Sequence, residues 1–343
     1  MFIRYNSKFS IFNYIVISIL LCSSCNKDEE GIKYDYSHFI PSHFPIPISN
    51  PDSIPTEAQF TLGKKLFFDP ILSRDGSLSC ASCHKPSLAF ADTVSVSAGV
   101  EGRLGNRNSP SLGNVVYQKK LLKEGGLPTL EMQVLVPIQE HAEFDNNIVE
   151  ISDKLMTIPK YVEMSQAAYK RDPDPYVITR AISAFERTLF SGDSKYDQFL
   201  NGRTKLTAIE EQGLNLFMSN KTNCSNCHSG FLLTNQNIEN NGLYSVYKDI
   251  GAMRLTQNPS DEGKFKIPSL RNIALTYPYM HDGSLKTLKE VIEHYNSGGS
   301  DHKNKNTLIK PLNLSQSEIE ALVAFLSTLT DYNFITNKNY QNE

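Results

Sequence analysis

The sequence contains the five-residue pattern C-x-x-C-H twice, at residues 80–84 and 224–228. Two cysteines at this spacing can form thioethers with the two vinyl groups on one edge of a porphyrin, and the histidine that follows then lies beneath the iron. A thioredoxin-like dithiol does not need the histidine, and a zinc ribbon would place its two cysteine pairs closer together. The pattern therefore predicts two covalently attached haems of the c type.

Each motif is expected to supply one axial histidine and two attachment cysteines. The predicted haem-binding residues are Cys80, Cys83 and His84 in the first motif and Cys224, Cys227 and His228 in the second. Of the six cysteines in the chain, this leaves only Cys22 and Cys25, so we expect no structural disulfide in the mature core.

The stretches that precede the two motifs follow one plan. Residues 56–59 and 207–210 both have the pattern of a helix capping box, and each is followed by Gly-x-x-Leu-Phe, at residues 63–67 and 213–217. A helix that leads into C-x-x-C-H is the arrangement of cytochrome c. We therefore predict a mainly α protein made of two cytochrome c-like domains with one covalent haem each. These domains are predicted at residues 56–190 and 205–332.

Apolar spacing and capping residues predict further helices in both halves, and we find no strand-rich region. Residues 191–204, which include two glycines, are interpreted as an interdomain linker. The additional helices are predicted within residues 130–169, 176–190, 285–295 and 315–329.

Residues 1–25 are interpreted as a lipoprotein signal segment. The apolar run at residues 11–21 is too short to span a bilayer, and Leu-Cys-Ser-Ser-Cys at residues 21–25 is similar to a bacterial lipobox. Cys25 is the favoured lipidated residue and Cys22 the second choice, while a cleaved signal peptide or an uncleaved anchor is the alternative. We expect a location in the cell envelope outside the cytoplasm, on the periplasmic face or outer surface, with the lipid anchor as the only membrane attachment.

Residues 26–55 are rich in proline and predict an extended tether. Its two histidines, His38 and His43, are interpreted as solvated linker residues rather than distant haem ligands. The net charge of −3 gives no broad basic surface, so nucleic acid is not an expected partner.

Residues 55–330 resemble the bacterial dihaem cytochrome c peroxidases and their MauG-type relatives. The resemblance rests on the two haem motifs and, after the second, on Phe-Lys-Ile-Pro-Ser-Leu-Arg-Asn at residues 265–272 and Tyr-Met-His-Asp-Gly at residues 279–283. It implies an N-terminal haem that meets hydrogen peroxide and a C-terminal haem that accepts electrons from a small donor, such as a cytochrome c or a cupredoxin. Peroxide would be reduced to water, and by analogy with the family the chain could form a homodimer.

The resemblance also implies a pocket beside the first haem. In the family a Gln, a Pro four residues later and a Glu ten residues after the Gln line this pocket, and here Gln133, Pro137 and Glu143 have that spacing. Glu143 would act as the acid and base that moves protons, Gln133 would hold peroxide or water, and Pro137 would shape the wall. Glu140 and His141 are the near alternatives to Glu143.

Many family members have a histidine that binds the first haem on its peroxide side. In this sequence that position is Val100, which cannot bind iron. The resemblance then implies a first haem that is open to peroxide without prior reduction. The competing interpretation is that loop flexibility lets His141 or Met132 bind instead.

The sixth ligand of the second haem is expected to be Tyr295. It lies fourteen residues after His281, at a position where the family's peroxidases have Met and MauG-type enzymes have Tyr. Met280 is the second candidate. Met253, His281 and His294 are further candidates.

Two other family features concern the region between the haems. The family usually has a Trp ten residues before the pocket Gln, but here that position is Lys123 and the chain contains no Trp. The family also binds a calcium ion, and the corresponding ligands are the side chain of Asn108 and the carbonyl oxygens of Thr276 and Pro278. The alternative for Asn108 is that it caps a turn.

Three functions remain in competition: a dihaem peroxidase, a MauG-like oxidase that modifies a partner protein, and a non-catalytic dihaem electron-transfer cytochrome. Glu143, Gln133 and Val100 argue against the third, because a pure electron carrier gains nothing from an open iron with a proton donor. Tyr295 favours the second over a typical peroxidase, and Lys123 departs from both.

Overall fold

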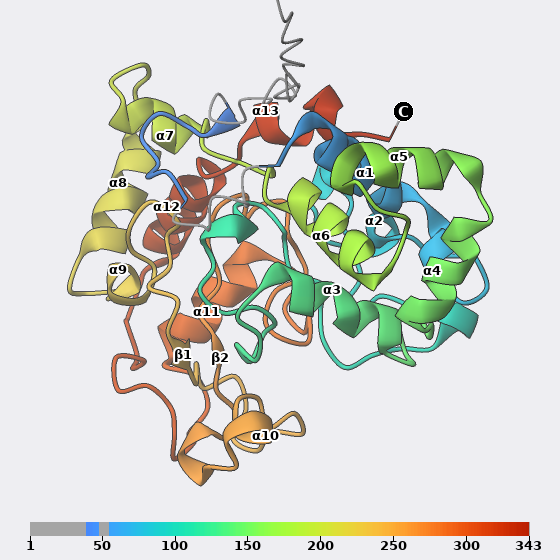
Figure 1. Cartoon of the computed structure of the whole chain (residues 1–343). Helices are drawn as coiled ribbons and strands as arrows, with labels where there is room; N and C mark the ends of the chain where they lie inside the picture. Colours follow the sequence, from blue (N-terminus) through green and yellow to red (C-terminus); the bar gives the residue numbers. More distant parts are fainter. Residues whose placement is uncertain (1–38, 48–54, 343) are drawn as a thin grey trace, which may run out of the picture. The chain divides into compact units, whose positions relative to one another are not determined.

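The computed structural model describes residues 39–47 and 55–342 of the chain (Figure 1). The described part is mainly helical, as the sequence predicts. The predicted signal segment, residues 1–25, and most of the predicted tether, including His38, lie outside the described residues. Within the described part, no helix has both the length and the apolar character that a membrane span requires.

The first half of the described chain folds around helices α1 and α6, which pack against each other (Figure 1). Thr56 caps α1 in a capping box with Gln59, as predicted. The α-helices (α) and short 3-10 helices (η) of this half are α1 (Glu57–Phe68), η3 (Pro70–Leu72), α2 (Cys80–Cys83), η4 (Pro86–Leu88), η5 (Val100–Gly102), η6 (Val115–Tyr117), α3 (Leu130–Gln139), α4 (Ile148–Met156), α5 (Pro159–Tyr169) and α6 (Pro175–Glu186).

The second half repeats this plan with α8 and α12, which also lie side by side (Figure 1). Thr207 forms the predicted capping box with Glu210. The elements are α7 (Lys195–Leu200), α8 (Ala208–Met218), α9 (Cys224–Cys227), β1 (Ile238–Glu239), α10 (Met253–Thr256), η7 (Pro259–Asp261), β2 (Phe265–Lys266), α11 (Leu288–Ser297), α12 (Gln316–Ser327), α13 (Tyr332–Ile335) and η8 (Lys338–Tyr340). Among the described residues the strands are β1 and β2, an antiparallel pair in which Ile238 faces Lys266.

A glycine sits where each helix pair touches. A Cβ atom on Gly63 of α1 would lie 1.9 Å from the carbonyl oxygen of Ala181 in α6, and a Cβ on Gly213 of α8 would lie 1.9 Å from the carbonyl oxygen of Ala321 in α12. Glycine is therefore required because the backbones approach too closely for any side chain. The shared Gly-x-x-Leu-Phe pattern of the sequence marks these two contacts.

The apolar residues form a separate core around each helix pair. The first core includes Phe67, Phe90 and Phe185, while the second is centred on Phe217 and Phe325. The residues after position 332, where the predicted second domain ends, pack against the first core. Phe334 and Tyr340 are buried in the first core, and the Tyr340 hydroxyl donates a hydrogen bond to the carbonyl of Thr188. The C-terminal segment is therefore part of the first domain's core.

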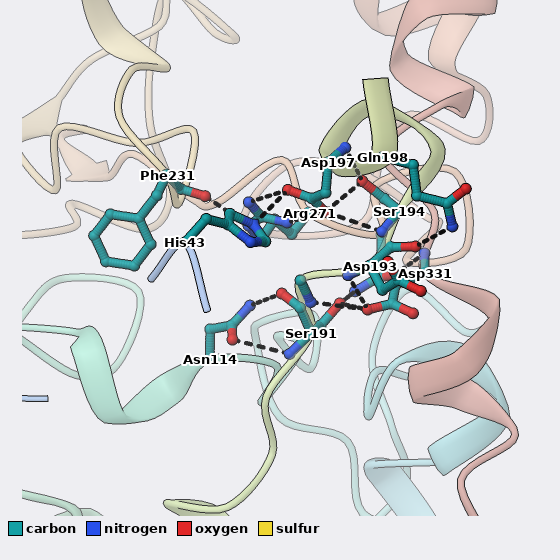
Figure 2. Close-up of polar contacts among 12 residues, drawn as sticks. His43, Asn114, Ser191, Asp193, Ser194, Asp197, Gln198, Phe231, Arg271 and Asp331 are labelled. Carbon is teal, nitrogen blue, oxygen red and sulfur yellow. Dashed lines mark hydrogen bonds and ion pairs between the residues drawn. The ribbon is translucent and has the colours of Figure 1, made fainter. Parts of the chain in front are cut away.

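The segment interpreted as an interdomain linker is not a plain linker. Residues 191–204 contain helix α7, and Asp197 is fully buried in an ion pair with Arg271, with oxygen-to-nitrogen distances of 2.8 and 2.9 Å (Figure 2). Burial would raise the pKa of Asp197, but the hydrogen bonds and charge of Arg271 and the bonds from Ser194 outweigh it and hold the pKa below its usual range. Both charges leave water together, so breaking the pair would leave a buried charge without a partner. The pair therefore fixes how helix α7 packs against the segment that contains Arg271.

The interpretation of His43 as a solvated linker residue is wrong. Its Nε2 atom lies 3.2 Å from Asp197 Oδ1, and its side chain is 24% exposed (Figure 2). The next residue, Phe44, is buried and packs edge-on against Phe231, with ring centroids 4.8 Å apart. Residues 39–47 are therefore attached to the folded part through a hydrogen bond and an aromatic contact, and no local sequence pattern reveals either contact.

We expect a methyl group at Gly213 to destabilise the second domain. At a helix position with free space for a side chain, replacing Gly by Ala raises the free energy of unfolding by up to about 1 kcal/mol. A lower free energy of unfolding would therefore report the steric clash alone. Gly213→Ala should lower the free energy of unfolding by about 1–3 kcal/mol because the backbones of α8 and α12 must separate. Thermal unfolding of the holoprotein measures this. The matched control is Gly105→Ala, where the nearest atom to the new Cβ is 3.9 Å away, and an equal loss in both variants would contradict the account.

Candidate functional site

The first C-x-x-C-H motif forms a single helical turn, α2, that ends at its histidine. The His84 amide donates to the carbonyl of Cys80 at 2.9 Å, and His84 Nδ1 lies 2.9 Å from the carbonyl oxygen of Phe90. Phe90 and the preceding Ala89 have positive φ angles, which turn that carbonyl toward the ring. With Nδ1 held by the carbonyl, Nε2 is the nitrogen left for a metal.

The second motif has the same geometry in α9. The His228 amide donates to the carbonyl of Cys224 at 2.9 Å, and His228 Nδ1 lies 3.1 Å from the carbonyl oxygen of Leu233. Burial lowers the pKa of His228 to about 4 and also lowers the pKa of His84. Both rings are thus neutral near pH 7, which is the form that binds a metal.

The chemistry of both donor sets fits a covalently bound haem. The four motif cysteines are free thiols rather than disulfides, so each pair is available for thioether formation. In both motifs the histidine that follows is neutral and oriented by a carbonyl group. Haem c could therefore be held by Cys80, Cys83 and His84 in the first domain and by Cys224, Cys227 and His228 in the second.

The predicted pocket residues come from α3 and the turn that follows it. Thr129 caps the start of α3, and Pro137 lies inside the helix, where it has no amide hydrogen to donate. The chain then reverses, because the Phe144 amide donates to the Pro137 carbonyl at 3.0 Å and the Glu143 amide to the Glu140 carbonyl at 2.9 Å. This turn separates α3 from α4 and carries Glu143, within a region that the sequence predicted only as helical.

Val100 and Glu143 are brought together by the backbone. The Val100 amide donates to the Glu143 carbonyl at 2.8 Å, and Val100 is fully buried. A Cβ on Gly99 would lie 2.1 Å from the carbonyl oxygen of Ala142, so the two segments are in close contact. The residue that stands in place of the family's histidine ligand is thus directly beside the predicted acid and base.

The Glu143 carboxyl lies close to the first motif and has an altered acidity. The residue is exposed in the structure, but the protein around its carboxyl group, with a smaller contribution from the charge of Glu140, raises its pKa to about 7. Burial raises the pKa of the Cys80 and Cys83 thiols, and the charge of Glu143 contributes to both. A carboxyl with this pKa can accept and return a proton near neutral pH.

The other residues considered for this pocket are held elsewhere or are exposed. The ring nitrogens of His141 lie 3.0 Å from Asp145 and 3.1 Å from Arg103, and the His141 side chain is 70% exposed. Met132 is 46% exposed. Gln133 is partly buried on α3, and its side chain makes no hydrogen bond within the described part of the chain, which leaves its amide group available.

Tyr295 lies on α11 beside the second motif. It packs against the second core together with Cys224, and burial raises the pKa of its hydroxyl to about 12. A hydrogen bond from Asn241 acts in the opposite direction, while the charges of Cys224 and Cys227 act with burial. The structure therefore brings Tyr295 to the second motif, and it adds Asn241, for which the sequence gave no signal.

The competing ligand candidates have other contacts. The Met280 Sδ atom accepts a hydrogen bond from Asn241 Nδ2 at 3.2 Å, and His294 Nε2 lies 3.1 Å from the Asn241 carbonyl. The His281 ring stacks on Phe265, with centroids 4.0 Å apart. Met253 begins α10 and is only partly buried.

The predicted calcium ligands do not form a fitting site. The Asn108 amide donates to the His281 carbonyl at 2.9 Å, which ties Asn108 to the segment that follows Thr276 and Pro278. However, Lys123 Nζ lies 3.5 Å from Asn108 Oδ1, the only side-chain oxygen of the predicted set. Burial lowers the pKa of Lys123 to about 8, so the amine is still mostly protonated and positive at pH 7. A calcium ion would be repelled at this distance.

The two halves of the chain match two families of known proteins. A family model described as di-haem cytochrome c peroxidase matches residues 57–205, and one described as cytochrome c matches residues 211–330. Both matches agree with the repeated geometry around His84 and His228.

Individual relatives match most of the chain. It is 33% identical to cytochrome-c peroxidase IdrP1 of Pseudomonas sp. strain SCT, with 83% of each chain covered, and 34% identical to the methylamine utilization protein MauG of Methylorubrum extorquens, with 84% of this chain and 82% of that protein covered. A solved MauG-like protein associated with microbial copper homeostasis is 35% identical, with a TM-score of 0.84 over 88% of this chain and 97% of that one. The chain belongs to the dihaem cytochrome c peroxidase and MauG family, which confirms the predicted family and implies two haem c groups.

We predict that Val100→His will place a ligand over the first haem. The new imidazole would stand where other family members have a histidine, next to Glu143. The optical spectrum of the ferric holoprotein should then lose its high-spin component, and the reaction with peroxide should slow at least tenfold until the protein is reduced. Val100→Leu, which keeps an apolar side chain there, is the control. Loss of the high-spin component in both variants would contradict this role for position 100.

Proposed function

We propose that this protein is a dihaem peroxidase that reduces hydrogen peroxide to water, with electrons that enter at the C-terminal haem and pass to the N-terminal haem. The observation that carries the proposal is the backbone contact between Val100 and Glu143 beside the first motif. It combines a side chain that cannot bind iron with a carboxyl that can move protons.

The chemistry divides between the cofactor and the protein. When bound, the first haem supplies the iron at which the oxygen–oxygen bond of peroxide is cleaved as two electrons are taken up. The overall reaction consumes one peroxide, two electrons and two protons and yields two water molecules. Glu143 takes a proton from one peroxide oxygen and returns it to the other, which leaves as water.

The other pocket residues hold the substrate and limit access. The unbonded amide of Gln133 can donate to one peroxide oxygen and accept from the other. Pro137 fixes the turn that carries Glu143, because its carbonyl accepts the Phe144 amide hydrogen. Val100 fills the space of a ligand with an apolar side chain, so we infer that peroxide can enter without prior reduction.

The second motif would serve as the electron entry point. We propose Tyr295 as the sixth ligand there, supported by its packing against the same core as Cys224. A phenolate is a hard anionic ligand that favours the ferric state. The donor is proposed to be a small cytochrome c or cupredoxin, in a protein that is anchored by a lipid at Cys25 in the cell envelope and that pairs as a homodimer.

A second candidate function is favoured by the same residue. Tyr295 stands at the position where MauG-type enzymes have tyrosine, and the solved relative of 35% identity is itself MauG-like. The alternative is therefore an oxidase that uses peroxide to modify residues of a partner protein. If peroxide is consumed slowly with small donors but rapidly with a protein substrate that becomes oxidised, this alternative replaces the peroxidase.

The test of the proposed function is peroxide turnover with a reduced cytochrome c in Glu143→Gln. Removal of a positioned acid and base should reduce kcat/KM by about 10²–10⁴-fold while both haems remain bound. The matched control is Glu150→Gln, an exposed carboxyl on α4, which should leave turnover unchanged. If Glu143→Gln has the activity of the unaltered protein, Glu143 has no part in the mechanism.

The raised pKa of Glu143 gives a pH dependence with a defined sign. The carboxylate is the form that accepts a proton from peroxide, so kcat/KM should rise with pH and level off above the Glu143 pKa of about 7. Glu140→Gln removes a neighbouring negative charge that raises this pKa, so the rise should move to lower pH. A profile that does not change in Glu140→Gln would contradict the assignment.

A further inference from the structure

The Lys123 side chain lies between the haem-bearing halves of the molecule. Its Nζ atom is 3.5 Å from Asn108 Oδ1, in the first half, and 3.4 Å from the carbonyl oxygen of Met280, in the second half. Both acceptors are neutral oxygens. The ammonium group therefore stands between a side-chain oxygen from the first half of the chain and a backbone oxygen from the second half.

The backbone at Lys123 and the side chain of the next residue are both held, so this placement is not that of a loose surface lysine. The Lys123 carbonyl accepts a hydrogen bond of 2.7 Å from the amide of Lys266 in β2. The next residue, Glu124, has a fully buried side chain that pairs with both Arg107 and Arg254. The loop is thereby tied to the second half of the chain at Lys123, through Lys266, and at Glu124, through Arg254.

The surroundings disfavour a divalent metal at this place. Neutral oxygens of this kind can bind calcium, but the Lys123 Nζ atom lies 3.5 Å from Asn108 Oδ1, and its positive charge would repel a calcium ion. Asn108 also uses its Nδ2 atom to donate to the Val94 carbonyl at 3.1 Å, which fixes its amide with Oδ1 toward the lysine.

We propose that the ammonium group of Lys123 is a built-in cation that links the two haem domains and makes a bound calcium ion unnecessary. Its positive charge is attracted to the Asn108 and Met280 oxygens, as a metal ion would be, but it is attached covalently and cannot be removed by a chelator. The inference concerns the junction alone, so it stands whether or not the proposed peroxidase activity is correct.

The first test uses the unaltered holoprotein and calcium itself as the probe. Titration calorimetry should detect no calcium binding at micromolar to low-millimolar concentrations. The thermal unfolding midpoint and the spectra of both haems should be the same in the presence of EGTA and of millimolar calcium. Stoichiometric binding of one calcium ion, or an unfolding midpoint that falls on addition of EGTA, would overturn the proposal.

The second test removes the charge. Lys123→Met keeps much of the apolar stem but loses the ammonium group, so its unfolding midpoint should fall by several degrees, whereas Lys123→Arg, which keeps the charge, should lose less. Lys119→Met, at an exposed lysine of the same loop, is the matched control and should not change the midpoint. If Lys123→Met unfolds at the same temperature as the unaltered protein, the lysine does not link the domains. If Lys123→Met does not fold, the calcium titration of the unaltered protein decides alone.

Discussion

The hydrogen bond between each axial histidine and a backbone carbonyl is the constraint on which the rest of the site depends. Phe90 and Leu233 supply these carbonyls, and each leaves the Nε2 atom of its histidine free for iron. The direction of that nitrogen, together with the two cysteines of each motif, determines where a haem plane can lie. In the first domain Glu143 lies close enough to this motif for its charge to raise the pKa of both Cys80 and Cys83.

The helix pairs keep those histidines in place. Gly63 and Gly213 let α1 and α8 approach their partner helices until the backbones are in contact, and each of these helices precedes its C-x-x-C-H motif in the chain. Because the same contact occurs in both halves, the two halves provide equivalent supports for haem. The functional difference between them comes from the residues around each motif, which are Val100 and Glu143 in one domain and Tyr295 and Asn241 in the other.

The sequence predicts those parts of the fold that depend on local pattern. The capping boxes at Thr56 and Thr207, the two haem motifs and the mainly helical character are all confirmed. Contacts between distant segments could not be read in the same way. The Val100–Glu143 hydrogen bond and the Lys123–Met280 contact join loops whose paths depend on how whole helices pack. The spacing of residues in the sequence therefore does not predict these contacts. The family resemblance pointed to Glu143 and Val100 separately, and only the structure shows that they are neighbours. From the sequence, Lys123 is only the residue that replaces the family's tryptophan, whereas the structure shows that its amine contacts Asn108 and Met280.

The central claim is that the first haem is open on the side of Glu143 while the second has a ligand on both sides. The electron paramagnetic resonance spectrum of the resting ferric holoprotein tests this directly. The account predicts one high-spin signal from a five-coordinate haem beside one low-spin signal from a six-coordinate haem, with equal integrated intensity. Two low-spin signals in the resting protein would contradict it.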